Sequence, residues 1–483
     1  MRFVKHLFFA FGYGALGVFI TILIVYGAHL QNRPDLRLWH VVNLTEEFTT
    51  EKADQIQTFP KYLELEERLF RQLRRTMYQQ NDDPNKNLLN RYFDGSRADP
   101  INVLPDWNRS FEVTVDKPRG GVLLVHGLSD SPYSMRALAR TFHEQGYYVV
   151  GLRLPGHGTA PAGLTTATWQ DWAAATRLAA RYVRQKIGKN KPFYMGGYST
   201  GAALVVEYSL AVLEGDALPA ANGLILVSPA IGVAPVAALA EYQAKLAVIP
   251  GLEKLAWDSI QPEYNPYKYQ SFAVNAGDQI YRLTREIEKR INRLDEGKGV
   301  SGVPPIVAFQ SVVDATVSTK ALVQVLFKRL ASEGHELVLF DVDRSAHFES
   351  FLVYDPVEDI KQLFADPYLP FATTLLTNLD PDSREIIARH RVAGPTRISD
   401  EKVNLAWPDE IYSLSHTALP FRPDDPVNGE KRPRDQKLVY LGRIDLRGER
   451  GLFIVPATEM LRQKYNPFFS YMENRIITFI SKK

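Results

Sequence analysis

The chain has 483 residues, a formal net charge of +2 and no cysteine. This length exceeds the roughly 250–300 residues of one compact core, so we expect additional segments around a single main domain. The near-neutral charge gives no sign of nucleic-acid binding. The absence of cysteine excludes disulfides, thiolate catalysis and cysteine-rich zinc sites.

Residues 1–31 are expected to form an N-terminal transmembrane anchor. Leu7 to Leu30 contains no Asp, Glu, Lys or Arg over 24 residues. As a helix this run would be about 36 Å long, against about 30 Å of bilayer hydrocarbon. Arg2 and Lys5 precede it and favour a cytoplasmic N-terminus, although Arg33 and Arg37 follow closely. We therefore predict an uncleaved anchor, in preference to a signal peptide, with the body of the chain periplasmic or otherwise extracytoplasmic.

One face of the predicted anchor carries small residues at Ala10, Gly14, Gly17 and Thr21. Small residues at this spacing can form the seam between two membrane helices, which would give a homodimer. The alternative is that these residues have no such role, because small residues are frequent in membrane helices.

Residues 32–107 are expected to form a helical connector between the anchor and the main domain. Pro60 to Tyr78 repeats apolar residues near every fourth position, which predicts an amphipathic helix. Arg71, Arg74 and Arg75 could contact anionic lipid headgroups, but a solvated helix face is the simpler interpretation.

Residues 108–234 alternate apolar runs with helical patterns in the order of a doubly wound, mostly parallel α/β sheet. This segment is expected to form the first part of the core. The expected strands are residues 110–115, 121–125, 147–152, 191–196 and 223–230, and the expected helices include residues 133–145 and 202–208.

The pentapeptide Gly197-Tyr198-Ser199-Thr200-Gly201 has the form of a nucleophile elbow. An apolar run precedes it and a helical pattern follows it, so Ser199 would lie on a sharp strand-to-helix turn. The pentapeptide alone would equally fit a glycine-rich surface turn. The strand that ends in His126-Gly127, roughly seventy residues upstream, favours the elbow.

These motifs resemble the α/β-hydrolases that include monoacylglycerol lipases, lysophospholipases and small bacterial carboxylesterases, often described as serine aminopeptidase-like. The resemblance rests on the His126-Gly127 turn, on Pro155-Gly156-His157-Gly158, on the helix with Trp169 and Trp172, and on the elbow. It covers residues 110–235 strongly and residues 300–345 moderately. Among these relatives, the anchor would make the chain a membrane-bound bacterial type.

The resemblance implies an α/β-hydrolase fold with Ser199 as nucleophile. The backbone N–H groups of Leu128 and Thr200 would then form the oxyanion hole. Arg153 departs from the family, in which an aspartate often precedes the Gly-His-Gly turn. His157 is expected to be structural and to hold its loop by hydrogen bonds.

Residues 235–300 interrupt the alternation of strands and helices and are expected to form a helical cap over the site. Their aromatic cluster of Tyr264, Tyr267, Tyr269 and Phe272 would suit an acyl chain. A cap that packs only on itself is the alternative interpretation.

Residues 301–344 resume the core with a strand at 304–311, and Asp314 follows it where the acid of a Ser-His-Asp triad belongs. Asp341 and Asp343 are rival carboxylates in the next strand pattern, residues 336–342. We interpret these two as surface charges at the end of a strand.

Two histidines can complete the triad. His347 follows the strand at 336–342, at the expected start of a helix from Ser345 to Tyr354. His416 follows a strand-like run and precedes a proline-rich loop. We favour His416, which makes residues 345–409 an insertion with a hairpin, 373–378 and 385–391, and residues 410–483 a C-terminal core segment with a final helix.

The predicted function is a membrane-anchored serine hydrolase that cleaves carboxylic esters, with lipid or acyl esters as substrates. A lipase, a lysophospholipase or a carboxylesterase would fit. The expected partners are the ester substrate and the membrane, and no metal, organic cofactor or nucleic acid is needed. Alternatives on the same triad are a peptidase, a thioesterase or an acyltransferase, and a non-catalytic envelope protein on this scaffold is a further alternative.

Overall fold

The structure is a computed structural model. It describes residues 31–78, 89–232, 249–314, 317–347, 352–395, 397–409, 411–434, 437–445 and 462–481, together with residues 13, 14, 17, 21, 246 and 247. Most of the predicted anchor Leu7–Leu30, including Ala10 of its small-residue seam, lies outside these residues, as does the first part of the predicted cap. Within the described residues, no helix has both the length and the apolar character needed to cross a bilayer.

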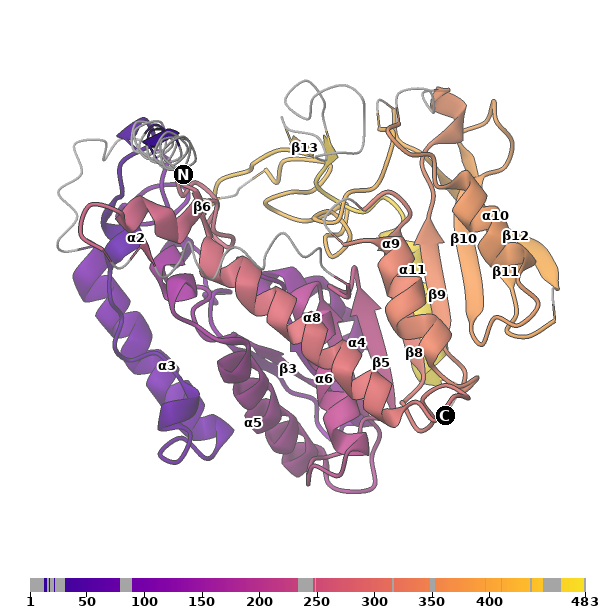
Figure 1. Ribbon diagram of the computed structural model, residues 1–483, viewed down its shortest axis with the longest axis horizontal. Helices are drawn as coiled ribbons and strands as arrows, with labels where there is room; N and C mark the ends of the chain where they lie inside the picture. The colour runs from indigo at the N-terminus through magenta and orange to yellow at the C-terminus, as the bar shows by residue number, and fades with distance from the viewer. Residues whose placement is uncertain are drawn as a thin grey trace, which may run out of the picture.

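Ten strands form one sheet in the order β1-β3-β2-β4-β5-β8-β9-β10-β11-β12 (Figure 1). The strands from β3 to β10 are parallel, whereas β1 at one edge and β11 and β12 at the other are antiparallel to their neighbours. The mostly parallel sheet expected from the sequence is therefore confirmed. The strands that matter for the site are β1 (Phe111–Val113), β2 (Gly120–Val125), β3 (Tyr147–Leu152), β4 (Phe193–Tyr198), β5 (Gly223–Val227), β8 (Ile306–Ser311) and β9 (Glu336–Phe340).

Helices cover both faces of this sheet, and side chains that alternate along each strand fill the two layers between them. Leu123 and Val125 of β2 face the layer with α5 (Trp169–Ile187), α6 (Thr200–Leu213) and α8 (Val274–Leu294). Val122 and Leu124 face the other layer, with α4 (Arg136–Glu144) and α11 (Phe469–Ser481). This alternation follows from the two-residue period of a strand. It explains why the central strands are continuous apolar runs, buried on both faces.

The predicted cap, residues 235–300, needs correction in its second half. Residues 274–294 form the long helix α8, which packs against α6 and α5 and buries Ile280, Leu283, Ile287 and Ile291 in the main core. The reason is topological, because two parallel strands such as β5 and β8 need a crossover, usually a helix. Between them, the described residues 249–273 form the short helix η7 (Glu253–Ala256) and the pair β6 (Trp257–Ser259) and β7 (Phe272–Ala273).

The aromatic residues assigned to the cap pack against core loops. The ring of Tyr267 stacks on Tyr133 at 4.0 Å between centroids, and the Tyr269 hydroxyl accepts the Thr159 amide at 2.7 Å. Both side chains are buried. These two residues therefore contact the core segment 108–234, so they fit neither a pocket for an acyl chain nor a cap that packs only on itself.

Residues 352–409 extend the main sheet. β10 (Ala372–Asn378) pairs in parallel with β9, and β10 and β11 (Glu385–Arg391) form the antiparallel hairpin. The helix α10 (Val357–Ala365) precedes them, and the strand β12 (Ile398–Ala406) follows. β12 was not expected, because this strand is exposed and has no alternating apolar pattern in the sequence. Strands β10 to β12 lie at the opposite end of the molecule from α3 (Figure 1).

The connector contains the expected amphipathic helix, α3 (Phe59–Leu73), whose N-terminal cap is Thr58. Its apolar repeat is buried, and Arg71, Arg74 and Arg75 are exposed, as expected for a solvated face.

Arg153 explains how this connector is held. The Arg153 side chain is only 1% exposed, and it pairs with Glu47 and Glu66, each at 2.9 Å. Its carbonyl accepts the Tyr62 hydroxyl at 2.7 Å. All three partners belong to the connector, so the residue that departs from the family pattern fixes a segment that precedes the core.

Candidate active site

Ser199 lies at the turn between β4 and α6 in a strained backbone conformation. Its φ is 53° and its ψ is −115°, a region that residues other than glycine rarely adopt. Three backbone hydrogen bonds hold it there. The Ser199 amide donates to Val227 at 2.9 Å, and its carbonyl accepts the amides of Ala203 and Ala230, each at 3.1 Å. The surrounding backbone thus enforces an elbow that presents the serine above the sheet edge.

The glycines of the pentapeptide are required by close packing. A Cβ at Gly197 would overlap the backbone of Gly201 and Ala202, and a Cβ at Gly201 would overlap the carbonyl of Val125. A Cβ at Gly127 would come within 3.2 Å of the Ser199 Cβ. The loop after β2 therefore lies directly against the serine, as the resemblance implied.

The two predicted oxyanion donors flank this contact. Leu128 follows Gly127 in the loop, and Thr200 is the first residue of α6. The first amides of a helix have no intrahelical acceptor, so the Thr200 N–H is available to a ligand. The Tyr269 amide donates to the Ser129 carbonyl at 2.8 Å and fixes the loop from the other side.

Two buried histidines maintain the loops around the serine. His126 donates from Nδ1 to the Gly127 carbonyl at 2.8 Å and accepts the Leu154 amide at Nε2 at 3.0 Å. His157 donates from Nδ1 to the Pro155 carbonyl at 3.0 Å. Burial lowers the pKa of His126 well below its ordinary value and lowers that of His157 to about 3. Both stay neutral, and the structural role expected for His157 agrees with these contacts.

Asp314 and His416 meet above the carboxyl ends of the strands. The His416 Nδ1 lies 2.9 Å from Asp314 Oδ2, and the two side chains are 6% and 0% exposed. The Gln310 amide donates to the same oxygen at 3.0 Å, and the Val317 N–H donates to Oδ1 at 2.9 Å. A carboxylate with these donors accepts the His416 Nδ1–H, which leaves Nε2 with a lone pair.

The imidazole of His416 also lies against the residue that precedes the serine. The rings of His416 and Tyr198 are 5.3 Å apart, and the Tyr198 hydroxyl donates to the His416 carbonyl at 3.4 Å. The fold thus brings three distant residues into one region, namely Ser199, Asp314 and His416. The first and the last of them are 217 residues apart in the sequence.

The structure leaves the alternative, His347, apart from Asp314. Its side chain is 62% exposed and its Nε2 lies 3.3 Å from Asp382. The helix expected from Ser345 does not begin there. The described residues form a short 3₁₀ turn, Arg344–Ala346, whose N-terminal cap is Asp343, and His347 ends it with φ at 51°.

Asp341 and Asp343 are not the surface charges that we expected. Both are 4% exposed. Asp341 pairs with Arg344 at 2.8 Å and accepts the Thr377 hydroxyl at 2.8 Å, and Asp343 accepts the Asn378 amide at 2.9 Å. The physical reason is β10, which continues the sheet beside β9 and covers its end.

Sequence reasoning missed two residues at the site. Gln310, on β8, orients Asp314, and its position inside an apolar strand was the available signal. Asp130, in the loop after Leu128, is 2% exposed, and burial raises its pKa to about 6 although Lys268 and His416 act in the other direction. Its sequence context, Ser129-Asp130-Ser131-Pro132, is indistinguishable from that of an ordinary surface turn.

Two comparisons relate part of this chain to known proteins. The model of the family described as "Serine aminopeptidase, S33" matches residues 116–342, a range that includes Ser199 and Asp314 and ends before both candidate histidines. A thermostable monoacylglycerol lipase of Bacillus sp. (strain H-257) is 25% identical over 235 residues, which are 49% of this chain and 85% of that protein.

Two solved structures resemble about half of this chain in fold. One metagenome-derived lipolytic enzyme is 23% identical with a TM-score of 0.39, and the match covers 54% of this chain and 99% of that one. The monoacylglycerol lipase of Paleococcus ferrophilus is 19% identical with a TM-score of 0.36, over 48% of this chain and 89% of that one.

Proposed function

We propose that this chain, which belongs to the α/β-hydrolases of the serine aminopeptidase S33 and monoacylglycerol lipase group, hydrolyses carboxylic esters with Ser199, His416 and Asp314 as its catalytic triad. The observation that carries the proposal is the 2.9 Å contact between His416 and Asp314, next to a serine held in a strained elbow. This pairing supplies the general base that a serine nucleophile needs.

In the proposed mechanism, Nε2 of neutral His416 takes the proton of Ser199 as the hydroxyl oxygen attacks the ester carbonyl. The amides of Leu128 and Thr200 hold the oxyanion, and each such donor contributes roughly 3 kcal/mol to the stability of the transition state. Protonated His416 then passes its proton to the leaving alcohol. Water repeats the sequence on the acyl-enzyme and releases the acid. Asp314 stays ionised and orients the imidazole throughout.

A lipid or acyl ester is the proposed substrate class. The similarity to a thermostable monoacylglycerol lipase supports this class, and so does the apolar N-terminal run, which would keep the enzyme at a lipid surface. A peptidase is the second candidate, because the matching family is described as a serine aminopeptidase. Thioesterases and acyltransferases use the same triad.

The membrane anchor Leu7–Leu30 and an extracytoplasmic catalytic domain are parts of the same proposal. Arg33, just after the run, donates to the carbonyls of Lys254 at 3.0 Å and Asp258 at 2.9 Å, which supports a fixed attachment of the anchor to the domain.

The protein should stay in the membrane pellet after carbonate extraction, whereas a chain that starts at residue 32 should be released. A C-terminal tag shielded from protease in spheroplasts would reverse the orientation. The small-residue seam is where a dimer would form.

The test of the activity combines labelling with a substrate panel. A fluorophosphonate probe should label the wild-type protein and the Ser345→Ala control, and it should not label Ser199→Ala. Turnover should be measured with p-nitrophenyl esters of increasing chain length and with an aminoacyl p-nitroanilide. We expect ester turnover that Ser199→Ala abolishes. Labelling of Ser199→Ala would refute the nucleophile, and turnover of the anilide alone would replace the esterase with a peptidase.

A further inference from the structure

Asp425 follows His416 in the same loop and is buried, with an exposed fraction of 4%. Its carboxylate accepts the amides of Val427 at 2.9 Å and Asn428 at 2.8 Å. Its carbonyl accepts the Gly429 amide at 2.8 Å, and a Cβ at Gly429 would overlap that carbonyl. This tight turn therefore holds the Asp425 side chain in one orientation.

The same carboxylate binds two residues that follow the oxyanion loop. The Tyr133 hydroxyl lies 2.9 Å from both oxygens of Asp425, and the Arg136 guanidinium donates to Oδ2 at 3.0 Å. Burial, together with the Asp425 carboxylate, raises the pKa of Tyr133 well above its ordinary value, so the hydroxyl stays protonated and donates. Tyr133 belongs to the short 3₁₀ helix η4 (Pro132–Met135), just after the loop of the predicted donor Leu128. The contact thus joins the loop of the base to the loop of an oxyanion donor.

Aromatic rings surround this contact and exclude water from it. Tyr133 stacks on Tyr267 with 4.0 Å between the ring centroids, and the ring of Phe421, which precedes the turn, lies 6.0 Å from Tyr133. All three rings are buried in one apolar cluster. The Arg136 guanidinium lies 4.9 Å from the centre of the Tyr133 ring. Hydrogen bonds to a charged group are stronger where water is excluded, so these surroundings strengthen the attachment.

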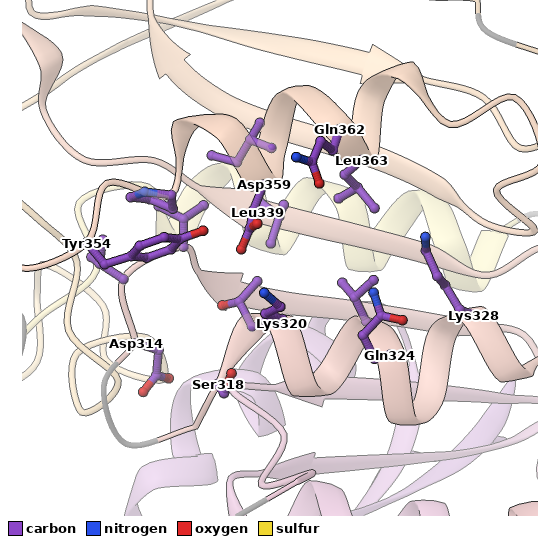
Figure 2. Close-up of a pocket in the computed structure, with 16 residues that line it drawn as sticks. Asp314, Ser318, Lys320, Gln324, Lys328, Leu339, Tyr354, Asp359, Gln362 and Leu363 are labelled. Carbon is purple, nitrogen blue, oxygen red and sulfur yellow. The ribbon is translucent and has the colours of Figure 1, made fainter.

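Other contacts hold the loop of the base on the C-terminal segment. The backbone amide of Asn466 donates to the Phe421 carbonyl at 2.8 Å, and its side-chain amide donates to the Leu419 carbonyl at 3.3 Å. The loop of Asp314, by contrast, borders a cavity of about 700 Å³ between the segment after β8 and α10 (Figure 2). The site is therefore partly open beside its acid and closely packed around Asp425.

We propose that Asp425 is a positioning residue, which holds the loop of His416 on the oxyanion loop and so sets the distance between the base and the oxyanion donors. This role rests on the proposed ester hydrolysis, and Asp425 acts through His416 without touching the substrate. The chain reaches His416 only after residues 345–409, so a contact in space has to place this loop. Base and donors act on one tetrahedral intermediate, where a displacement of about 1 Å costs on the order of 10²-fold in rate. Asp425 lies beyond residue 342, where the family match ends.

The test compares Asp425→Asn with the matched control Asp341→Asn in the full-length protein. Both carboxylates are 4% exposed, and each accepts hydrogen bonds from an arginine, a hydroxyl and at least one backbone amide. In Asp425→Asn the side-chain amide would present a donor to the Arg136 guanidinium, which needs an acceptor. We expect kcat for a p-nitrophenyl ester to fall about 10–100-fold in Asp425→Asn, with KM within about threefold of the wild type. Asp341→Asn should lose stability in urea but keep both constants, and an equal kcat in the two variants would overturn the proposal.

A second variant, Tyr133→Phe, decides the matter if Asp425→Asn does not fold. It removes one hydroxyl from the contact and keeps the ring that stacks on Tyr267. We expect kcat to fall about tenfold with KM close to that of the wild type, because the two loops would separate while the substrate still binds. A Tyr133→Phe enzyme with the kcat of the wild type would overturn the proposal.

Hydrogen–deuterium exchange measures the attachment without any turnover. Both Asp425→Asn and Tyr133→Phe should exchange about tenfold faster than the wild type in peptides that cover residues 126–136 and 414–421, and Asp341→Asn should not. Faster exchange confined to residues 414–421 would overturn the proposal, because Asp425 would then hold only its own loop. A wild-type protein that hydrolyses no ester would refute the proposed function, whereas exchange in the two loops would still decide whether Asp425 joins them.

Discussion

The ends of β8 and β9 are adjacent in the sheet, and each carries aspartates that a histidine follows later in the chain. At the end of β8, Asp314 faces His416 in a buried contact at 2.9 Å. At the end of β9, Asp341 is equally buried but is bound by Arg344, and His347 lies in solvent. The difference comes from what covers each strand end. The loop with His416 returns over β8, whereas β10 fills the space beside β9.

This comparison teaches that the order and spacing of residues do not identify a triad. Both ends offer a carboxylate after a strand and a histidine within reach of the sheet edge. What separates them is the group that the fold places beside each carboxylate, which is the imidazole of His416 at Asp314 and the guanidinium of Arg344 at Asp341. The carboxylate oxygens of Asp341 accept hydrogen bonds from the Arg344 guanidinium, the Thr377 hydroxyl and the Val342 amide.

Alanine substitutions of the two histidines, His416 and His347, should give the largest difference between the two strand ends. We expect His416→Ala to lower kcat by about four to six orders of magnitude, because the serine would lose its general base. His347→Ala should keep kcat within about threefold of the wild type, since its side chain is 62% exposed and lies against Asp382 at the surface. The measurement is steady-state hydrolysis of a p-nitrophenyl ester. A His416→Ala enzyme with kcat close to that of the wild type would mean that the contact between Asp314 and His416 has no catalytic role.

The aspartates give the second contrast. Asp314→Asn should lower kcat by about 10⁴-fold with unfolding behaviour close to that of the wild type, because an amide at this position favours the wrong tautomer of His416. Asp341→Asn should keep kcat and instead lower the free energy of unfolding by about 1–3 kcal/mol, since Arg344 would lose its buried partner. Parallel kinetics and urea unfolding separate the two effects. A folded, fully active Asp314→Asn enzyme would transfer the role to another carboxylate.

The elbow, the His126-Gly127 loop and the position of Asp314 could be predicted because each depends on a local sequence of strand, turn and helix. Gly197 and Gly201 are needed wherever a strand turns so sharply into a helix, so the motif itself carries the geometry. The burial of Asp341 could not be predicted in this way. It depends on β10, which pairs with β9 from residues more than thirty positions further along the chain.

Two other differences have the same origin. Residues 274–294 are amphipathic, but the sequence does not say whether their apolar face covers an active site or the sheet, and in α8 it covers the sheet. β12 has charged residues along an exposed edge, where pairing with β11 replaces the apolar pattern as the cause of the strand. Local patterns thus predicted the parts of the fold that local contacts determine.

A third strand end, that of β3, extends the comparison from catalysis to assembly. There Arg153 binds Glu47 and Glu66 of the connector. We expect Arg153→Met to lower the free energy of unfolding by about 3–5 kcal/mol, because Glu66 would stay buried without its cation. The control Arg389→Ala removes an ion pair with Asp400 that is more than 40% exposed, and it should cost less than about 1 kcal/mol. Equal losses in urea unfolding would show that the connector is held by other contacts.

The smallest expected effect is a pH dependence at the same strand end. His157 has its pKa lowered to about 3 by burial, so between about pH 3 and 6.5 the unfolded chain binds one proton that the folded chain does not. Stability from this group is therefore complete above pH 6.5 and falls as the pH is lowered, by roughly 1.4 kcal/mol per pH unit. Between pH 6.5 and 5, the wild type should lose about 2 kcal/mol more than His157→Gln, which has no such proton to exclude. Urea unfolding at the two pH values measures this difference, and His347→Gln, at an exposed histidine, should leave it unchanged. A difference between the wild type and His157→Gln that stays constant with pH would mean that His157 is accessible to protons in the folded protein.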